Sequence, residues 1–343
     1  MKICASCVLP ETFPGIKFNE EGVCQHCLRY EKVPEQRHRE TRERFQMKFR
    51  EMAGKIRGKG GYDVLMAYSG GKDSSYTLRY LSQETGLKVL AVTFDNRFLS
   101  PTAHKNIRTV TSALNVDHIS YSIGFPRAKM VFRRSATEDI YPLKSLERAS
   151  SICNTCMYLA KSIILKIGIE KGIPMIAYGW SPGQAPVQSS VMKLSDSMVR
   201  QNQGLMRSRL EVLMGEDVEP YLLQERHYRM MEEQERFFDG SFLYNVHPLA
   251  FIDYDEDEIV RIITQMGWIE PSDTDSNSTN CLLNSFANLV HMNKYGFHPY
   301  AFEIAGLVRE GVMSREEGLK KLGKEPSQEI VETVRNSLDI KSL

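Results

Sequence analysis

The sequence predicts an α/β protein in which helices alternate with the strands of a parallel sheet. Apolar runs of the length of a buried strand stand at residues 63–68, 88–95, 118–122 and 174–179. Helical patterns separate these runs, among them 102–115 and 157–171. The composition, 42% hydrophobic and 25% charged residues, is that of a globular protein with a substantial core. Strands that alternate with helices are typical of parallel sheets with right-handed crossovers.

Length and charge exclude several classes of protein. A chain of 343 residues corresponds to roughly two domains and needs no disulfides to bury a core. The net charge of +1 gives no sign of a nucleic-acid or membrane partner. We see no run near the roughly 20 apolar residues that span a bilayer, and no apolar stretch like that of a signal peptide at the N-terminus. We therefore expect a cytoplasmic protein that does not associate with a membrane.

Residues 1–32 contain two close pairs of cysteines, Cys4 with Cys7 and Cys24 with Cys27, in the pattern C-x2-C-x16-C-x2-C. So short a segment cannot bury a core, and a bound metal ion would supply the missing stability. Four thiolates in two short turns suit tetrahedral zinc. Because four protein ligands leave no open position, we expect a structural zinc ribbon rather than a catalytic metal.

Residues 33–60 are expected to form a basic linker helix. An apolar stripe recurs at Phe45, Phe49, Met52 and Ile56, with the spacing of one helix face. Many Lys and Arg residues surround the stripe. Such a run is usually a solvated face, and binding of a polyanion is the open alternative.

The predicted nucleotide-binding domain, residues 61–182, begins with the strand at 63–68 and the sequence Ser-Gly-Gly-Lys-Asp-Ser at 69–74, which opens a helix. Two glycines let the backbone approach a phosphate closely, and the free amides of a helix N-terminus attract the anion. Lys72 adds a positive charge, and Ser69 and Ser74 add hydroxyl donors. The alternative is that this segment is an ordinary turn between a strand and a helix, with no bound phosphate.

The remaining chain divides into two predicted parts. Residues 183–245, rich in Gln, Ser, Met and Arg, are expected to form a helical insertion or lid rather than sheet. Residues 246–343 would complete the catalytic region and end in a helical tail. In that tail, Ser314 and Glu317 have the spacing of a capping box.

The loop at 69–74 resembles the PP-loop of the ATP pyrophosphatase superfamily, whose pattern is SGGxDS. It lacks the spacing of a Walker loop. The resemblance implies a Rossmann-like parallel sheet of the adenine nucleotide alpha hydrolase type, and ATP with Mg²⁺ cleaved between the α- and β-phosphates. It further implies that Lys72 takes part in catalysis. The residues it implies for ATP binding are Ala67, Ser69, Gly70, Gly71, Lys72, Asp73, Ser74, Phe94, Asp95, Asn96 and Gly179.

Three further cysteines, Cys153, Cys156 and Cys281, form a C-x-x-C pair and a distant single residue. Soft thiolates favour iron–sulfur clusters or zinc, and three of them leave a coordination position open. Two alternatives remain: packed core thiols, or a persulfide on one cysteine that another resolves. The arrangement resembles that of PP-loop tRNA thiolation enzymes. This resemblance implies a 4Fe-4S cluster on the three residues and a catalytic role for each.

A second resemblance covers nearly the whole chain. The opening CxxCVLPxTxPGIxFxxEGVCxxC, together with the segments 294–296 and 313–318 near the end, is similar to the N-acetyl sugar amidotransferases. Those PP-loop enzymes convert an acetamido group into an acetamidino group with ammonia from a glutaminase partner. This sequence departs from them at Cys153 and Cys156. Because ammonia delivery needs no soft metal, a complete three-cysteine set favours sulfur.

These observations together predict an ATP-dependent sulfurtransferase that adenylates a substrate carbonyl oxygen and replaces it with sulfur. The balanced charge favours a small-molecule acceptor over tRNA. The donor would be sulfide or a sulfur carrier, and a homodimer is compatible with the sequence. The alternatives are the sugar amidotransferase and a non-catalytic nucleotide-binding module.

Overall fold

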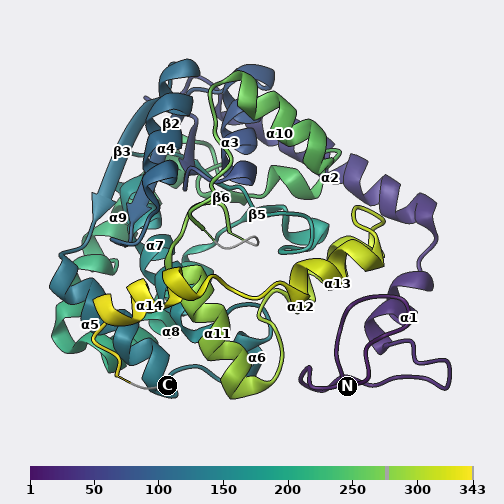
Figure 1. The fold of residues 1–343 in the computed structure, drawn as a ribbon. Helices are drawn as coiled ribbons and strands as arrows, with labels where there is room; N and C mark the ends of the chain where they lie inside the picture. The colour runs from purple at the N-terminus through teal and green to yellow at the C-terminus, as the bar shows by residue number, and fades with distance from the viewer. Residues whose placement is uncertain (275–277, 342–343) are drawn as a thin grey trace.

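The structure is a computed structural model that describes residues 1–274 and 278–341 (Figure 1). Six strands form one sheet in the order β3-β2-β1-β4-β6-β5. Neighbouring strands are parallel except β5, which runs antiparallel to β6 at the edge. The strands are β1 Val64–Ala67, β2 Val89–Asp95, β3 Asp117–Ser122, β4 Met175–Tyr178, β5 Val191–Lys193 and β6 Tyr244–Val246.

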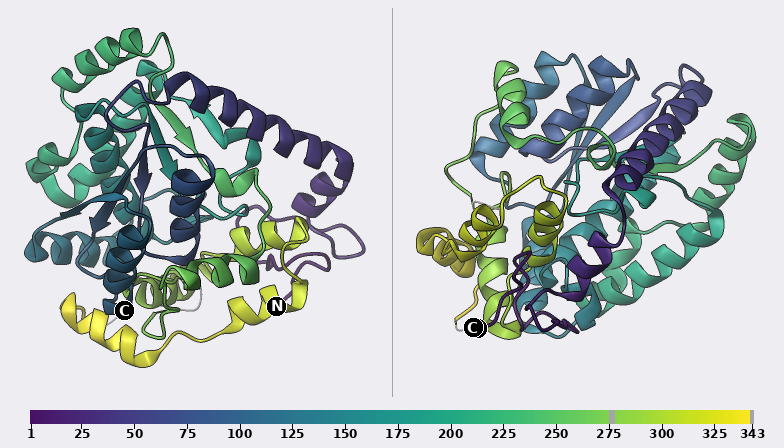
Figure 2. Two further views of the ribbon diagram at one scale, coloured as in Figure 1. Left: turned by 90° about the horizontal axis from the view of Figure 1, so that it is seen from above. Right: turned by 90° about the vertical axis from the view of Figure 1, so that its right-hand side faces the viewer.

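Helices cover both faces of the sheet, as Figures 1 and 2 show. The crossovers from β1 through β2 to β3 carry α3 and α4, and α10 packs on α3. The chain then returns to β4 through α7, which packs across β1, β2 and β4 beside α5, α8 and α9. The bounds are α3 Lys72–Arg79, α4 Pro101–Ala113, α5 Phe125–Thr137, α6 Leu143–Leu146, α7 Ser151–Glu170, α8 Asp196–Met214, α9 Glu225–Phe237 and α10 Glu256–Gln265. Shorter turns are a π-helix at Tyr80–Glu84 and 3₁₀ turns at Val187–Ser189, Gly215–Tyr221 and Pro248–Ala250.

The N-terminal segment lies against helices of the last fifth of the chain, although the two termini themselves stand apart (Figure 1). After α1, Gln25–Glu31, the long helix α2, Glu35–Ile56, follows an outer edge of the molecule (Figure 2). Its predicted apolar stripe is buried, and it packs against β5. The C-terminal helices are α11 Leu283–Tyr295, α12 Ala301–Arg309, α13 Arg315–Gly323 and α14 Gln328–Ser337. The capping box of Ser314 and Glu317 is present at the start of α13.

The hydrophobic core has three parts. One surrounds the sheet and includes the buried side of α2. The second lies between α5, α7, α8, α11 and α14. The third joins the four N-terminal cysteines to α12, and it contains Phe13, Phe297 and Ile304. The N-terminal segment is therefore packed on the C-terminal helices rather than held out as a separate unit.

The predicted α/β class with a parallel sheet is confirmed, but one expectation is wrong. The segment 183–245 does contribute to the sheet, through β5 and most of β6. Strands of three residues are too short to show a periodic pattern. In addition, α7 is long and apolar enough to span a membrane by length and composition, although half of its most apolar stretch is buried inside the protein. We interpret α7 as a core helix, because it packs across the sheet.

Candidate functional site

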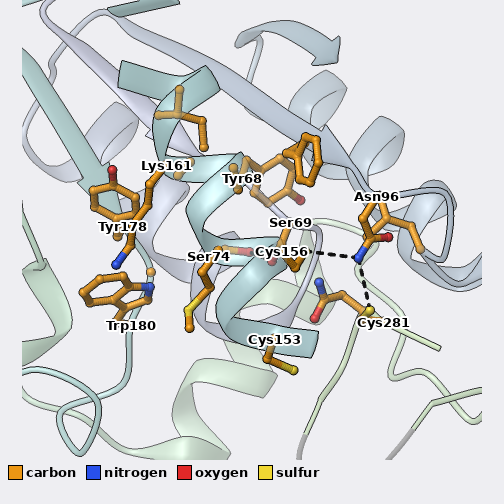
Figure 3. Close-up of a pocket in the computed structure, with 18 of the residues that line it drawn as sticks. Tyr68, Ser69, Ser74, Asn96, Cys153, Cys156, Lys161, Tyr178, Trp180 and Cys281 are labelled. Atoms are coloured by element: carbon orange, nitrogen blue, oxygen red, sulfur yellow. Dashed lines mark hydrogen bonds between the residues drawn. The ribbon is translucent and has the colours of Figure 1, made fainter. Parts of the chain in front are cut away.

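A cavity of about 300 Å³ opens at the carboxyl ends of β1 and β4 (Figure 3). This is the point where the strand order reverses, since β1 is followed in the sheet by β2 on one side and β4 on the other. Ligands of open α/β sheets bind at such a point. Of the predicted ATP-binding residues, the cavity lining includes Ala67, Ser69, Ser74, Phe94, Asn96 and Gly179.

The loop after β1 is held in one shape by short contacts. The hydroxyls of Ser69 and Ser74 lie 3.1 Å apart, and the Ser74 hydroxyl donates to the carbonyl of Gly71 at 3.0 Å. The indole of Trp268 donates to the carbonyl of Gly70 at 3.0 Å. Both serines therefore face the cavity from a preorganised turn, where hydroxyl and amide donors suit an anion.

Two glycines are required where backbone segments approach closely. A Cβ atom at Gly179 would lie 2.5 Å from the Cα of Ser74, so the end of β4 touches the start of α3. Gly70 has a φ of +76°, and a Cβ there would lie 2.8 Å from the carbonyl oxygen of Ala103. Both glycines thus shape the cavity, although Gly70 does not line it.

Lys72 does not reach this cavity in the structure. Its ammonium donates to the hydroxyl of Tyr254 at 2.9 Å and lies 3.2 Å from Glu256 and 3.4 Å from Asp73. Burial lowers the pKa of Lys72, but the two carboxylates outweigh burial, and the net pKa is raised. The predicted contact between Lys72 and a phosphate therefore stays a prediction, and it would require the ammonium to leave Glu256.

Four other predicted residues also lie outside the cavity lining: Gly70, Gly71, Asp73 and Asp95. Asp73 accepts from Tyr254 at 2.9 Å, in the group around Lys72. Asp95 accepts from the backbone N–H of Arg97 at 2.7 Å and shapes the turn after β2.

The structure brings Cys153, Cys156 and Cys281 to the wall of the same cavity. Cys153 and Cys156 stand in the first turns of α7, which Ser150 caps. Cys281 pairs with Leu99 in an isolated bridge, so the segment after β2 fixes its position. Asn96 joins the two groups, because its amide donates to both Cys156 Sγ and Cys281 Sγ at 3.4 Å (Figure 3).

Burial raises the pKa of all three thiols, that of Cys153 to about 11. Such thiols are protonated at neutral pH and become ligands only when a metal replaces the proton. In the described residues, the three sulfurs are not as close together as the N-terminal four. The predicted cluster on these three residues therefore stays a prediction, and Asn96 is a donor to two of their sulfurs.

The N-terminal cysteines have the opposite geometry. All four are buried, and their sulfurs lie within 4.8 Å of one another, close enough to share one metal ion. The backbone N–H groups of Cys7 and Cys24 point at Cys4 Sγ, at 3.4 and 3.2 Å. Hydrogen bonds from Cys27 and Cys7 lower the pKa of Cys24. A closed site for one metal ion therefore fits these four residues.

Several cavity residues were missed by the sequence analysis. Lys161 from α7 and Tyr178 and Trp180 beside Gly179 form one wall (Figure 3). Tyr68, Asn280, Asn284 and Tyr300 complete the polar part of the lining. No local pattern identifies them, except that Tyr178 and Trp180 flank a glycine at the end of a strand.

No family model matches the sequence. An uncharacterized protein of Methanocaldococcus jannaschii is 25% identical over 336 residues, 97% of either chain. A U34-tRNA thiolase from Methanococcus maripaludis with its 4Fe-4S cluster has 14% identity and a TM-score of 0.36, over 100% of this chain and 90% of that one. An NMN synthetase from Francisella tularensis has 10% identity and a TM-score of 0.37, over 89% and 98%. TM-scores this low carry no argument about function.

Proposed function

We propose that this protein is an ATP-dependent sulfurtransferase that adenylates a carbonyl oxygen of its acceptor. The observation that carries the proposal is the placement of three cysteines in one cavity with the serines of the loop after β1. A nucleotide phosphate on that loop would stand next to the thiols. Few other reactions need both groups within one small cavity.

The proposed reaction has two steps. The acceptor oxygen attacks the α-phosphorus of ATP, the bond to the β-phosphate breaks, and pyrophosphate leaves. Sulfide then attacks the activated carbon, and AMP departs with the original oxygen. The hydroxyls of Ser69 and Ser74 and the first amides of α3 would stabilise the charge on the departing pyrophosphate. Gly179 would leave room for the α-phosphate.

We assign Cys153, Cys156 and Cys281 to a 4Fe-4S cluster. Such a cluster on three cysteines supplies one iron that can bind sulfide. The chain's own contribution is geometric, because Asn96 donates to the sulfurs of Cys156 and Cys281, and α7 holds Cys153 and Cys156 in register. We assign zinc to Cys4, Cys7, Cys24 and Cys27, whose closed site would stabilise the fold.

The test is anaerobic purification of the full chain with analysis of iron, sulfide and zinc. We expect brown protein with about four irons per chain and broad visible absorption. Cys281→Ser should lose the colour and the sulfur transfer but still bind ATP. The matched control is Ser151→Ala in the first turn of α7, where the hydroxyl has no hydrogen bond in the described chain. This variant should keep both the colour and the activity.

Three results would contradict the proposal in whole or in part. Colourless, iron-free protein that uses ammonia would make it an amidotransferase. Colourless protein that carries a persulfide would retain sulfur transfer without the cluster. ATP binding without release of AMP and pyrophosphate, with any acceptor or nucleophile, would leave only a nucleotide-binding module.

A further inference from the structure

A second cavity, of about 320 Å³, adjoins the first and shares part of its wall. Lys161, Tyr178 and Trp180 line both cavities, so these three side chains form the boundary. The second cavity extends from that boundary toward β5, β6 and α8. Its volume is at the lower end of the range for small-molecule sites.

The boundary carries a cation without a counter-ion. The ammonium of Lys161 lies 4.5 Å from the ring centroid of Trp180. Within residues 1–274 and 278–341, no carboxylate forms an ion pair with it. Buried charges in proteins are normally paired, so this ammonium is suited to an anion that arrives with a ligand.

Two buried polar atoms of β6 and the residue after it also have no partner. His247 is 4% exposed and stacks on Trp180 at 4.4 Å, yet its Nδ1 makes no hydrogen bond in the described chain. The Oδ1 atom of Asn245 is likewise unpaired there. Both residues line the second cavity. Native buried polar atoms are seldom left unpaired, which points to a ligand that completes them.

The rest of the second cavity is mostly apolar, with Ser189, Asn202 and Gln203 as polar exceptions. Its wall is formed by Leu165, Met192, Leu194, Val199 and Met206. A ligand that fits has a charged end at Lys161 and an apolar body beneath it. A nucleobase stacked on Trp180 fits less well, because His247 already occupies a face of that ring.

We propose that the second cavity is the acceptor site, and that its acceptor is a small carboxylate with an apolar body. This inference rests on the proposed function. The carboxylate beside Lys161 would face the nucleotide cavity, and one of its oxygens would attack the α-phosphorus as pyrophosphate leaves. Sulfide then attacks the acyl carbon and the C–O bond to AMP breaks. The products are AMP, a thiocarboxylate and a proton.

The experiment measures binding to the full-length, anaerobically purified chain by ligand-observed NMR. The probes are hexanoate and benzoate, each against its uncharged amide. We expect each carboxylate to bind about 10-fold tighter than its amide, because an ion pair in a low-dielectric site is worth more than a neutral contact. Lys161→Met should abolish that difference.

A second pair of variants separates the two cavities. Asn202, exposed at the mouth of the second cavity, is changed to Trp to block it. Gln201→Trp, at an exposed neighbouring position of α8 that lines neither cavity, is the matched control. Asn202→Trp should weaken carboxylate binding at least about 10-fold and leave ATP binding unchanged, whereas Gln201→Trp should change neither.

Several outcomes would overturn the inference. These are equal affinity for carboxylates and amides, or equal binding by the Asn202→Trp and Gln201→Trp variants. Loss of ATP binding but not of carboxylate binding in Lys161→Met would place the anion on the nucleotide. Pyrophosphate release that tRNA alone stimulates would exclude a small acceptor. The two proposals fail in distinguishable ways. If Asn202→Trp blocks carboxylate binding but the unmodified protein forms no AMP with any acceptor, the proposed function fails. If the protein forms AMP and Asn202→Trp forms it equally well, only this acceptor site fails.

Discussion

At the scale of single residues, Lys72 is held by Glu256, Asp73 and Tyr254 rather than by the cavity. Its side chain is 11% exposed, whereas that of Glu256 is 41% exposed. Removal of the ammonium would leave two carboxylates without their shared partner. Water screens Glu256 in part, which reduces the effect.

We therefore expect Lys72→Met to lower the free energy of unfolding by about 1–2 kcal/mol. Denaturant-induced unfolding would measure it. The matched control is Lys321→Met, because Lys321 pairs with the same Glu256 but is more exposed than Lys72, at 34% of its side chain. It should cost less than about 0.5 kcal/mol. Equal costs for the two variants would show that burial of Lys72 has no energetic consequence.

The buried ring of His247 makes stability depend on pH. Burial, together with the nearby charge of Lys161, lowers the pKa of His247 from 6.5 to about 4. Between pH 6.5 and pH 4, His247 is protonated in the unfolded chain but neutral in the folded chain. The free energy of unfolding therefore decreases as the pH falls from 6.5 toward 4. We expect His247→Phe to reduce the loss between pH 7 and pH 5 by about 2 kcal/mol.

Thermal unfolding at both pH values would test this prediction. His291, whose pKa burial also lowers to about 4, contributes a second share, so the variant removes only part of the dependence. An unchanged difference between the two pH values in His247→Phe would mean that this ring is accessible to protons in the folded protein.

At the scale of elements, the start of α3 and the end of β4 touch through Gly179. We expect Gly179→Ala to weaken ATP binding and to lower stability by about 1–3 kcal/mol, since the new methyl group would overlap the backbone of Ser74. Calorimetric ATP titration and thermal unfolding would measure the two effects.

Gly204→Ala in α8 is the control, because a Cβ there meets nothing within 4 Å. It should be neutral or slightly stabilising, as alanine favours a helix. If Gly179→Ala binds ATP like this control, the close approach of β4 and α3 does not shape the nucleotide site.

The elements also show which features a single sequence reveals. β1, the loop at 69–74 and α3 could be predicted because apolar runs and glycines are local signals. The four N-terminal cysteines could be grouped by their spacing alone. The edge strand β5 could not be predicted, because three residues give no period. Tyr254, Glu256 and Lys161 were missed because only the packed fold brings them to the loop or the cavity.

At the scale of the whole molecule, the segment with the four N-terminal cysteines contacts the C-terminal helices α12 and α13. The guanidinium of Arg315, the first residue of α13, donates to the carbonyls of Cys4 and Cys7 at 2.9 to 3.1 Å. The same segment shares a hydrophobic cluster with α12. A metal ion at the N-terminus would therefore stabilise elements about 300 residues away in the sequence.

We expect removal of that metal by a chelator, or the variant Cys24→Ser, to accelerate hydrogen exchange in α1, α12 and α13. Exchange in β1 and β2 should change little, because the main core does not include the cysteines. Mass spectrometry of deuterated peptides would measure both regions. Uniform acceleration throughout the chain would indicate global unfolding. No change in α12 would show that the metal at the N-terminal cysteines does not stabilise this helix.

One feature of α7 limits which molecules could react. Cys156 and Lys161 are five residues apart on this helix, which corresponds to a rise of about 7.5 Å and a rotation of about 140° around its axis. The spacing cannot shorten while the helix stays intact. If sulfur enters near Cys156 and the acceptor's carboxylate binds at Lys161, α7 sets a fixed separation between the sulfur donor and the acceptor. Acceptors would then be sorted by whether their apolar body lets the carboxylate carbon stand within reach of both Lys161 and the sulfur.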